Sequence, residues 1–232
     1  MKTRKAKLPF VLVNMAVTAD GKIATANRAI SSFTSARDRE HLLELRATAD
    51  AVMAGARTVD SAPINLGPGP PRYRRQRLKR GLAQYNLRVV VSRSGTVNPQ
   101  AVVFRHRFSP IIILTTRRAN AGRLKQLRAL ADVVKICGRE EINFRAAFRW
   151  LRKRWHVKRL LCEGGGELND ALFRAGLVDE LHLTLCPKIF GGRHAPTIAD
   201  GRGFSQLSQA ESFQLKSTCP NNGELFTVFV RG

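Results

Sequence analysis

Three consecutive glycines, Gly164–Gly166, form the pattern in this chain that is best suited to hold a ligand. They follow the apolar run Leu160–Cys162 and lead directly into a helical pattern. Backbone without a Cβ can approach a pyrophosphate closely, and the helix behind Gly166 offers N–H groups and a positive dipole end to an anion. The run is not the G-x-G-x-x-G fingerprint of dinucleotide-binding folds, and a tight strand-to-helix turn needs glycine as well. The pattern therefore predicts an anion-binding turn, with a purely structural turn as the alternative.

A second group of polar residues follows the first apolar run of the chain. Thr18, Asp20 and Lys22 surround an Asp20-Gly21 turn, and ligands bind beside such strand ends in open α/β sheets. The simpler interpretation is a tight turn without a ligand. The five histidines show no metal-ligand spacing, and no catalytic triad is recognisable. We therefore expect no metal site and name no side chain as a catalytic acid or base.

The hydrophobic pattern predicts the elements that must position these groups. Short runs that are apolar on both faces are typical of strands covered by helices on either side. Helical patterns lie between them, and Ser35 with Asp38 forms a capping box ahead of the first helix. This alternation predicts an α/β fold with a mostly parallel sheet. The expected strands are Phe10–Met15, Ala51–Ala54, Leu87–Val91, Ile111–Leu114, Val133–Cys137 and Leu160–Cys162, and the expected helices include Arg118–Leu130, Asn143–Trp155 and Leu168–Ala175.

The C-terminal region has a different pattern. Val178–Cys186 alternates as a strand, and Glu224–Val230 is a final strand preceded by the turn sequence Pro220–Gly223. The last two strands are therefore expected to pair antiparallel at one edge. The segment Ala62–Gln76 is rich in Pro, Gly and Arg, and either a binding loop or plain disorder fits that composition.

Length and composition fit a packed globular protein. The chain has 232 residues, of which 44% are hydrophobic, and one domain is the default expectation. No apolar run approaches the ~20 residues of a membrane span, and the apolar stretch behind the basic start is too short for a secretory signal. The four cysteines are scattered without a C-x-x-C pair. We expect reduced thiols and a cytoplasmic protein.

The net charge is the strongest compositional signal. Forty Lys and Arg against 17 Asp and Glu give +23, which attracts any polyanion, so a nucleic-acid-associated protein is one alternative. The cations are spread through the chain, with local density at Arg72–Arg80 and Arg149–Arg159. For the second cluster, a solvated helix face is the alternative to a binding stripe. Polyanion binding would weaken steeply with salt, whereas cofactor binding in a cleft would persist.

Six segments, in order along the chain, point to one family. Together they resemble the riboflavin-biosynthesis pyrimidine reductases, and the similarity covers residues 8–231. The resemblance implies the dihydrofolate-reductase-like α/β fold, in which a mostly parallel central sheet is flanked by helices and ends in an antiparallel C-terminal edge. It also implies one reductase domain over 8–232 behind a basic tail at 1–7, and a homodimer. The segments are Asn14–Ala24, Gly55–Val59, Val89–Arg93, Ile112–Thr116, Cys162–Leu168 and Pro187–Gly192.

The same resemblance implies an NADPH-dependent oxidoreductase. Hydride from NADPH would open the ribosyl group of a phosphoribosylaminopyrimidine to the ribityl form, so the substrate is a phosphorylated small molecule. The cofactor carries that chemistry, and the protein must align donor and acceptor. A related reductase of another pyrimidine or pterin-like substrate is the alternative.

Site residues are carried over from the resemblance position by position. The groups expected around the cofactor are Thr58, Ser92, Arg93, Thr115, Thr116, Gly164, Gly165, Gly166 and Glu167. Among them, Arg93 and the hydroxyl groups of Ser92, Thr115 and Thr116 would bind the adenosine 2′-phosphate and so favour NADPH over NADH. Taken singly, each of these residues is equally well explained as a polar residue at the end of a strand. The groups expected around the substrate are Asn14, Asp20, Asn65, Leu66, Glu163, Gly191 and Gly192.

One position departs from the family pattern. The acidic residue that usually follows the Gly-x-x-Thr-Val segment falls on Ala62. If that acid holds the ribose hydroxyls, either Asp60 or Asn65 replaces it or the substrate differs. The substrate phosphate calls for arginine, and the candidates are Arg72, Arg74 and Arg75.

Overall fold

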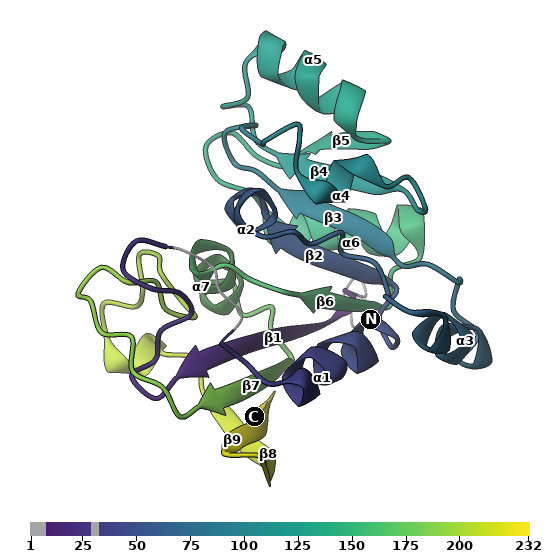
Figure 1. Ribbon diagram of the computed structural model, residues 1–232. Coiled ribbons are helices and arrows are strands. Elements are labelled where there is room, and N and C mark those ends of the chain that lie inside the picture. The colour runs from purple at the N-terminus through teal and green to yellow at the C-terminus, as the bar shows by residue number, and fades with distance from the viewer. Residues whose placement is uncertain (1–7, 29–32) are drawn as a thin grey trace, which may run out of the picture. The chain divides into compact units, whose positions relative to one another are not determined.

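The computed structural model of this chain describes residues 8–28 and 33–232 (Figure 1). The expected basic tail at 1–7 lies outside the described residues. Backbone contacts divide the chain into two compact units. Unit 1 comprises the described residues up to Phe10 together with Arg46–Leu160, and unit 2 comprises Val11–Leu45 and Leu161–Gly232.

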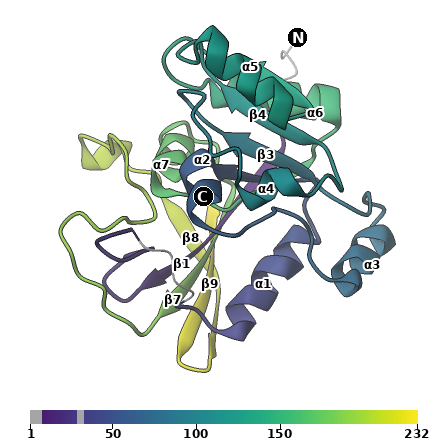
Figure 2. The ribbon, with the colours of Figure 1, turned by 45° about the horizontal axis from the view of Figure 1, so that its top comes forward.

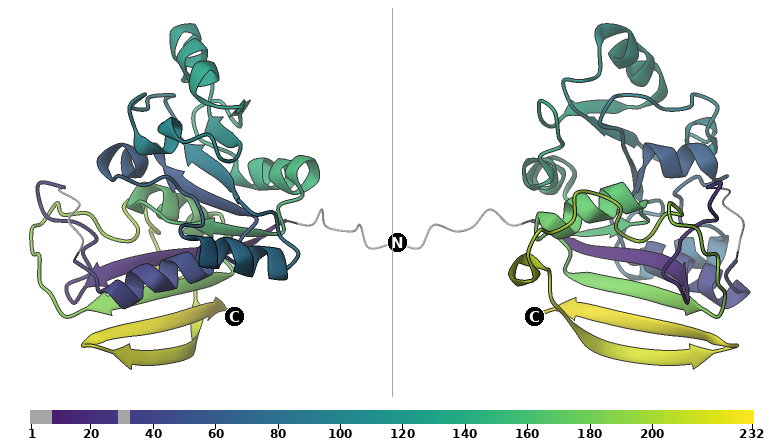
Figure 3. Two further views of the ribbon diagram at one scale, coloured as in Figure 1. Left: turned by 45° about the vertical axis from the view of Figure 1, so that its right-hand side comes forward. Right: turned by 90° about the vertical axis from the view of Figure 1, so that its left-hand side faces the viewer.

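Unit 1 is built on parallel strands in the order β5-β4-β3-β2 (Figure 1). Residues Ile111–Leu114 are fully buried on both faces, as parallel strands between helices must be. Helix α6 lies on one face of these strands and α2 on the other (Figure 3). The strands are β2 (Ala51–Gly55), β3 (Leu87–Val91), β4 (Ile111–Thr115) and β5 (Val133–Ile136), and the helices are α2 (Ala56–Ser61), α3 (Pro71–Lys79), α4 (Val102–Arg105), α5 (Ala121–Leu130) and α6 (Phe144–Trp155).

Side-chain caps fix where the longer helices of unit 1 begin. Asn120 accepts a hydrogen bond from the Arg123 N–H (2.9 Å) at the start of α5, and Asn143 accepts one from the Ala146 N–H (3.0 Å) at the start of α6. Each cap satisfies a backbone donor that has no partner inside the helix. Helix α6 ends at His156, which has a left-handed φ of 55°.

Buried arginines hold the loops of unit 1. The Arg88 guanidinium donates to the carbonyl oxygens of Val103 (2.8 Å), His106 (2.6 Å) and Ser109. Arg77 donates in the same way to the carbonyl oxygens at positions 46, 49 and 83. Burial lowers the pKa of each guanidinium to about 10, so both are charged at neutral pH. A buried cation is tolerated here because its donors are matched by carbonyl oxygens.

Unit 2 combines parallel and antiparallel pairing (Figure 2). Strand β1 pairs parallel with β7, β7 pairs antiparallel with β9, and β9 pairs antiparallel with β8. The antiparallel C-terminal edge that the sequence predicts is confirmed. The elements are β1 (Phe10–Thr18), α1 (Ala36–Arg46), the end of β6 (Arg159–Cys162), α7 (Gly166–Arg174), β7 (Glu180–Cys186), the 3₁₀ turn η1 (Leu207–Gln209), β8 (Phe213–Asn221) and β9 (Glu224–Arg231).

Helices α1 and α7 cover opposite faces of the unit 2 strands. His41 of α1 contacts the rings of His182 and Phe226, which the strand register puts on one face. Phe173 of α7 packs edge-on against Phe213, which the register puts on the other face. Side chains alternate between faces along a strand, so these ring pairs define the two layers.

The predicted capping box is half confirmed. The Ser35 hydroxyl accepts a hydrogen bond from the Asp38 N–H (3.2 Å). The Ser35 N–H does not use the Asp38 carboxylate but donates to Glu224 (2.7 Å), whose carboxylate also accepts from the Ser35 hydroxyl (2.5 Å). A buried acid from β9 therefore replaces the second half of the box.

Among the described strands, β8 is the one that the sequence analysis missed. The predicted turn is present, because Asn222 and Gly223 have φ of 49° and 79° between β8 and β9, as a two-residue hairpin turn requires. Most of β8 is exposed, so it lacks the apolar alternation that reveals a half-buried strand. The hydrophobic pattern did not predict this strand, because the strand buries little hydrophobic surface.

The segment Ala62–Gln76 is also more ordered than its composition suggested. Residues from Pro71 onward belong to α3, and Pro71 occupies the first helical turn, where its missing N–H costs nothing.

No helix of the described residues is long and apolar enough to cross a membrane.

Candidate active site

The Asp20 turn joins the end of β1 to a distant loop of unit 2. The Asp20 carboxylate accepts hydrogen bonds from the Thr18 hydroxyl (2.5 Å) and from the backbone N–H groups of Phe190 (3.2 Å) and Gly191 (2.7 Å). These bonds, chiefly the one from Thr18, lower the pKa of Asp20 below its usual value. Gly191 and Gly192 have φ of 62° and 82°, a conformation that glycine adopts without strain. Three predicted site residues therefore lie together here.

The same loop continues to the N-terminus of α7. Lys22 pairs with Thr197 in an antiparallel bridge, and the Thr197 N–H donates to the Asp200 carboxylate (2.9 Å). The Asp200 N–H in turn donates to the carbonyl oxygen of Gly166 (3.0 Å). Asn169 of α7 donates to the loop carbonyl at position 198 (2.9 Å). The Asp20 turn, the 187–203 loop and the glycine run thus form one connected group within unit 2.

Protein neighbours account for part of the glycine run. A Cβ at Gly164 would lie 2.5 Å from Sδ of Met15, and a Cβ at Gly166 would lie 2.7 Å from the carbonyl oxygen of Thr197. Gly164 also has φ of 80°, and its peptide bond to Gly165 is cis. These contacts favour the structural alternative at Gly164 and Gly166. Gly165 is different, because it is the N-cap of α7 and offers no side-chain cap to the helix.

Asn14 lies on the opposite face of β1 from Met15. Its register partner is His182, so its side chain is on the face that α1 covers. Asn14 is 8% exposed, and its Oδ1 has no hydrogen-bond donor within residues 8–28 and 33–232. A buried amide oxygen without a donor is costly unless a ligand or water supplies one. Glu163, the other polar candidate here, is half-buried directly after β6.

In unit 1, the predicted cofactor residues meet at the carboxyl ends of β3 and β4. The Thr116 hydroxyl donates to the carbonyl oxygen of Arg93 (2.7 Å), and the Ser92 hydroxyl donates to the loop carbonyl at position 96 (2.7 Å). Thr115 is fully buried, and its hydroxyl has no partner in the described part of the chain. The Arg93 guanidinium, by contrast, donates to the Glu141 carboxylate (2.8 Å) at an exposed position.

A hollow beside these strand ends was not predicted. Its volume is about 420 Å³, and it is lined by Arg117, Ile136, Gly138 and Arg139. Arg117 directly follows Thr116, and its N–H donates to the carbonyl oxygen of Gly138 (3.0 Å), so the ends of β4 and β5 bring the two arginines together. For Arg117, the sequence signal that could have indicated a ligand-binding role was its position directly after the end of a strand. Arg139 could not be found in that way, because only the strand pairing brings it near.

The remaining predicted residues of unit 1 follow β2. Thr58 lies in α2 and is half-buried. The Asn65 side chain accepts from the Gly67 N–H (2.9 Å), and Leu66 is fully buried with φ of 58°. Asp60 accepts from the Asn98 N–H (2.9 Å), and burial raises the pKa of its carboxyl. Both side chains that were considered as replacements for the acid expected at Ala62 thus hold backbone of unit 1.

Comparison with known proteins identifies the family of this chain. The model of the RibD C-terminal domain matches residues 9–220. The chain belongs to this family. A relative named 2,5-diamino-6-ribosylamino-4(3H)-pyrimidinone 5′-phosphate reductase, from Methanothermobacter thermautotrophicus, is 33% identical over 211 residues, which cover 90% of this chain and 91% of the relative. The resemblance to the riboflavin-biosynthesis reductases is confirmed, and a reductase of this family implies a nicotinamide cofactor.

Solved structures confirm the fold of the RibD C-terminal domain for this chain. Acinetobacter baumannii RibD has a TM-score of 0.77 at 20% identity, and the match covers 97% of this chain and 58% of that one. This chain therefore spans little more than half the length of that RibD. A pyrimidine reductase-like protein from Corynebacterium diphtheriae also has a TM-score of 0.77, at 23% identity, and the match covers 97% and 92% of the two chains.

The buried thiols of this RibD C-terminal domain are unsuited to nucleophilic chemistry. Burial raises the pKa of Cys162 to about 12 and that of Cys186 also to about 12. A thiol acts as a nucleophile only in its thiolate form. Both cysteines therefore serve as core residues at neutral pH.

Proposed function

We propose that this protein is an NADPH-dependent reductase that converts the ribosyl group of a phosphoribosylaminopyrimidine to the ribityl form in riboflavin biosynthesis. The observation that carries the proposal is the 33% identity to a named pyrimidinone phosphate reductase over 91% of that relative's length. A match of this extent along both chains supports a shared reaction. The chain's own residues would bind and orient the two ligands and exclude water, while NADPH supplies the hydride.

The start of α7 suits the pyrophosphate of a dinucleotide. Its N-cap, Gly165, provides no side-chain oxygen to the first turn, so backbone N–H groups and the positive dipole end suit an anion. We assign Gly164, Gly165, Gly166 and Glu167 to the pyrophosphate side of the cofactor and Thr58 to the nicotinamide side. The crowded Cβ positions at Gly164 and Gly166 leave Gly165 as the residue whose replacement tests this assignment.

Replacing Gly165 by valine is therefore the test of the pyrophosphate site. Gly165→Val puts a branched side chain where the pyrophosphate would approach the backbone, and we expect NADPH to bind about tenfold more weakly or worse. Binding is measured by NADPH fluorescence, and circular dichroism checks the fold. Gly122→Val is the control, because Gly122 is exposed in α5, has no positive φ, and a Cβ there makes only an ordinary contact of 3.6 Å with the Asn120 Oδ1. Unchanged NADPH affinity in folded Gly165→Val contradicts the assignment.

The ends of β3 and β4 suit the adenosine 2′-phosphate. Ser92, Arg93, Thr115 and Thr116 stay assigned to this end of the cofactor, as the sequence suggested. Because Glu141 already matches the charge of Arg93, we add the arginines of the neighbouring hollow, Arg117 and Arg139, as the cations that favour NADPH over NADH.

The ratio of kcat/KM for NADPH to that for NADH tests this choice. We expect Arg117→Glu to lower the ratio by at least tenfold, because a cation beside the phosphate becomes an anion. Arg93→Glu should lower it less, since Glu141 already neutralises the charge of Arg93 in the wild type. Equal ratios for wild type and Arg117→Glu would move the 2′-phosphate site elsewhere.

Substrate binding is proposed for the residues that the resemblance assigns to it. Asn14 offers a buried Oδ1 that lacks a donor in the described chain and suits a pyrimidine amino group. Asp20 acts by holding the backbone of Gly191. For the substrate phosphate, Arg75 is the preferred arginine, because Arg72 donates to Tyr73 and Arg74 to Tyr85. The full set is Asn14, Asp20, Asn65, Leu66, Glu163, Gly191 and Gly192.

We also propose a homodimer and a cytoplasmic location, with residues 8–232 acting as one reductase domain. Support for the dimer comes from strand β8, which is exposed over most of its length and carries Leu215 at 57% exposure. A second copy would cover such a surface. Light scattering after size exclusion measures the mass, and Leu215→Lys should shift it toward the monomer.

The decisive experiment follows NADPH oxidation by absorbance. The purified protein is given the deaminated and the non-deaminated phosphoribosylaminopyrimidine in separate reactions. Turnover of either supports the proposal and fixes whether reduction precedes deamination. NADPH binding without turnover of either contradicts it and favours a reductase of another pyrimidine or pterin-like substrate, for which Ala62 in place of the expected acid is the motivating observation.

A further inference from the structure

The excess positive charge is confined to one part of the described chain. Residues 46–160 of unit 1 contain 26 Lys and Arg against five Asp and Glu. Unit 2, over residues 11–45 and 161–232, contains ten Lys and Arg against 12 Asp and Glu. The cations occur throughout the chain, but they outnumber the acids strongly only in unit 1. Phosphates of a cofactor and a substrate would require only a few of these cations.

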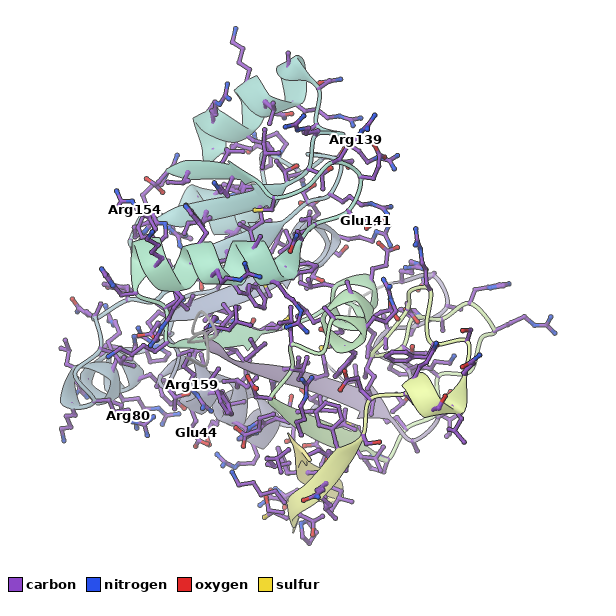
Figure 4. The ribbon with its side chains drawn as sticks, turned by 180° about the vertical axis from the view of Figure 1, so that it is seen from behind. Glu44, Arg80, Arg139, Glu141, Arg154 and Arg159 are labelled. Carbon is purple, nitrogen blue, oxygen red and sulfur yellow. The ribbon has the colours of Figure 1, made fainter. Side chains whose placement is uncertain are left out.

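Helix α6 carries one dense group of them, most of which is exposed. We call it the α6 surface, and it consists of Arg145, Arg149, Arg152, Lys153 and Arg154. The opposite side of the helix is apolar and buried against the strands of unit 1. Figure 4 shows α6 with Arg154 at one end and Glu141 near the other. The helix itself contains no acidic residue.

Helix stability does not explain this arrangement. Arg145, Arg149 and Lys153 are four residues apart, so they form a column with about 6 Å between successive cations. Like charges at this spacing destabilise a helix by about 0.2–0.5 kcal/mol per pair. The dipole favours cations only within the last turn. Among the described residues, Arg149, Lys153 and Arg154 make no ion pair, so no acidic side chain offsets the repulsion between Arg149 and Lys153.

The C-terminal half of the α6 surface is also separate from the proposed active site. In a strand-helix-strand connection the helix runs back along the sheet, so the C-terminal end of α6 lies at the amino ends of the parallel strands. The proposed ligand sites of unit 1 are at the carboxyl ends of β3 and β4, where ligands bind in such sheets. Arg152, Lys153 and Arg154 therefore cannot serve the 2′-phosphate.

We propose that the α6 surface binds the phosphate backbone of duplex nucleic acid without reading its sequence. A duplex carries one negative charge per ~1.7 Å of its axis, which suits a column of cations on a straight helix about 18 Å long. Arginine is prominent in the surface, and its planar group matches phosphate in bidentate geometry. This binding is independent of the reductase activity.

Other polyanions fit the surface less well. A single strand needs exposed aromatic rings for its bases to stack on, but Trp150 and Trp155 are half-buried, and Lys135 lies over the Trp150 ring at 5.4 Å. An anionic lipid surface attracts the same cations, but firm binding of a helix to it also buries an apolar face, and the apolar face of α6 is already buried against unit 1. The duplex is therefore the occupant that the observations favour.

The test measures binding of the full chain to a short fluorescent duplex DNA by anisotropy at several salt concentrations. If the wild-type surface contacts about four phosphates, log K should fall with log salt with a slope near −3.6. The variant Arg149→Gln/Lys153→Gln removes the exposed centre of the surface and keeps helix propensity. We expect it to bind about tenfold more weakly or worse, with a slope shallower by about 1.8.

A matched control separates this surface from net charge. Lys125→Gln/Arg128→Gln removes the same charge from α5, where both side chains are exposed, and should leave binding nearly unchanged. Equal loss in both double variants would show that only net charge matters and would overturn the proposal. It would also be overturned by binding that is absent at physiological salt, or by α6-dependent binding to anionic vesicles but not to the duplex. Preserved NADPH oxidation in Arg149→Gln/Lys153→Gln confirms a folded enzyme.

Discussion

Among the described residues, the side chains that the two units bury in charged form differ in sign, because unit 1 buries arginines and unit 2 buries acids. In unit 1, buried Arg77 and Arg88 donate to loop carbonyl oxygens. In unit 2, carboxylates accept from loop N–H groups, as Asp20 does for Gly191 and Glu224 does for Ser35. A loop leaves both kinds of backbone group without partners, and either sign of charge can satisfy one kind. The backbone groups of the loops therefore do not dictate which sign of charge a unit carries.

The difference also bears on where ligands can bind. The carboxylates of unit 2 hold backbone near the glycine run and the 187–203 loop, so the charge there is already matched by hydrogen bonds. Unit 1 instead exposes arginines at its hollow and on α6. Each unit therefore offers an anion a different kind of attraction, namely cationic side chains in unit 1 and backbone N–H groups in unit 2.

The largest effect is expected from removing a buried donor in unit 1. Arg88→Leu leaves the carbonyl oxygens of Val103, His106 and Ser109 without their donors. We expect a loss of about 3 kcal/mol or more in the free energy of unfolding, because each unsatisfied buried group costs about 1–3 kcal/mol. Urea denaturation measures it. Arg105→Leu, at an exposed arginine, should change stability by no more than about 0.5 kcal/mol, and equal losses would refute the role of Arg88.

A smaller effect is expected from the corresponding acid of unit 2. Glu224→Gln keeps the size of the side chain but turns one acceptor into a donor facing the Ser35 N–H or hydroxyl. We expect unfolding to become easier by about 1–3 kcal/mol. Glu211→Gln is the control, since its carboxylate forms a partly exposed ion pair with Arg231, worth at most about 1 kcal/mol. If Glu211→Gln were as destabilised as Glu224→Gln, the buried hydrogen bonds of Glu224 would not be the cause of its effect.

The smallest effect is expected from acid acting on the Asp20 turn. The pKa of Asp20 is lowered in the folded state, so its contribution to stability is fully present above the usual value of 3.8 and is lost as pH falls through the lowered value. The Gly191 amide, which donates to this carboxylate, should report the titration in NMR spectra. We expect a midpoint below 3.8 and no such transition in Asp20→Asn. A midpoint above 3.8 would contradict the hydrogen bonding described for this turn.

The sequence predicted the parallel strands well because their signal is local. Runs such as Ile111–Leu114 are apolar on both faces, and the structure forms buried strands at these positions. Strand β8 was not predicted, because most of its residues face solvent. The candidate site was harder to predict from the sequence, because its geometry depends on contacts between residues that are distant along the chain. Asp20 and Gly191 are far apart in the chain, and no local pattern indicates that one holds the other. The two arginines of the hollow likewise meet only through the pairing of β4 with β5.

Strand β8 has one further consequence, for solubility. A long exposed strand is a template on which other chains can add and grow into fibrils. Here the ladder with β9 is irregular between Leu215 and Ser217, Lys216 lies at the irregularity and reaches Glu180 (3.2 Å), and Pro220 near the end of the strand has no N–H to offer. Bulges, lysines and prolines are the features that interrupt such growth. The most exposed strand of the protein is therefore a poor seed for aggregation.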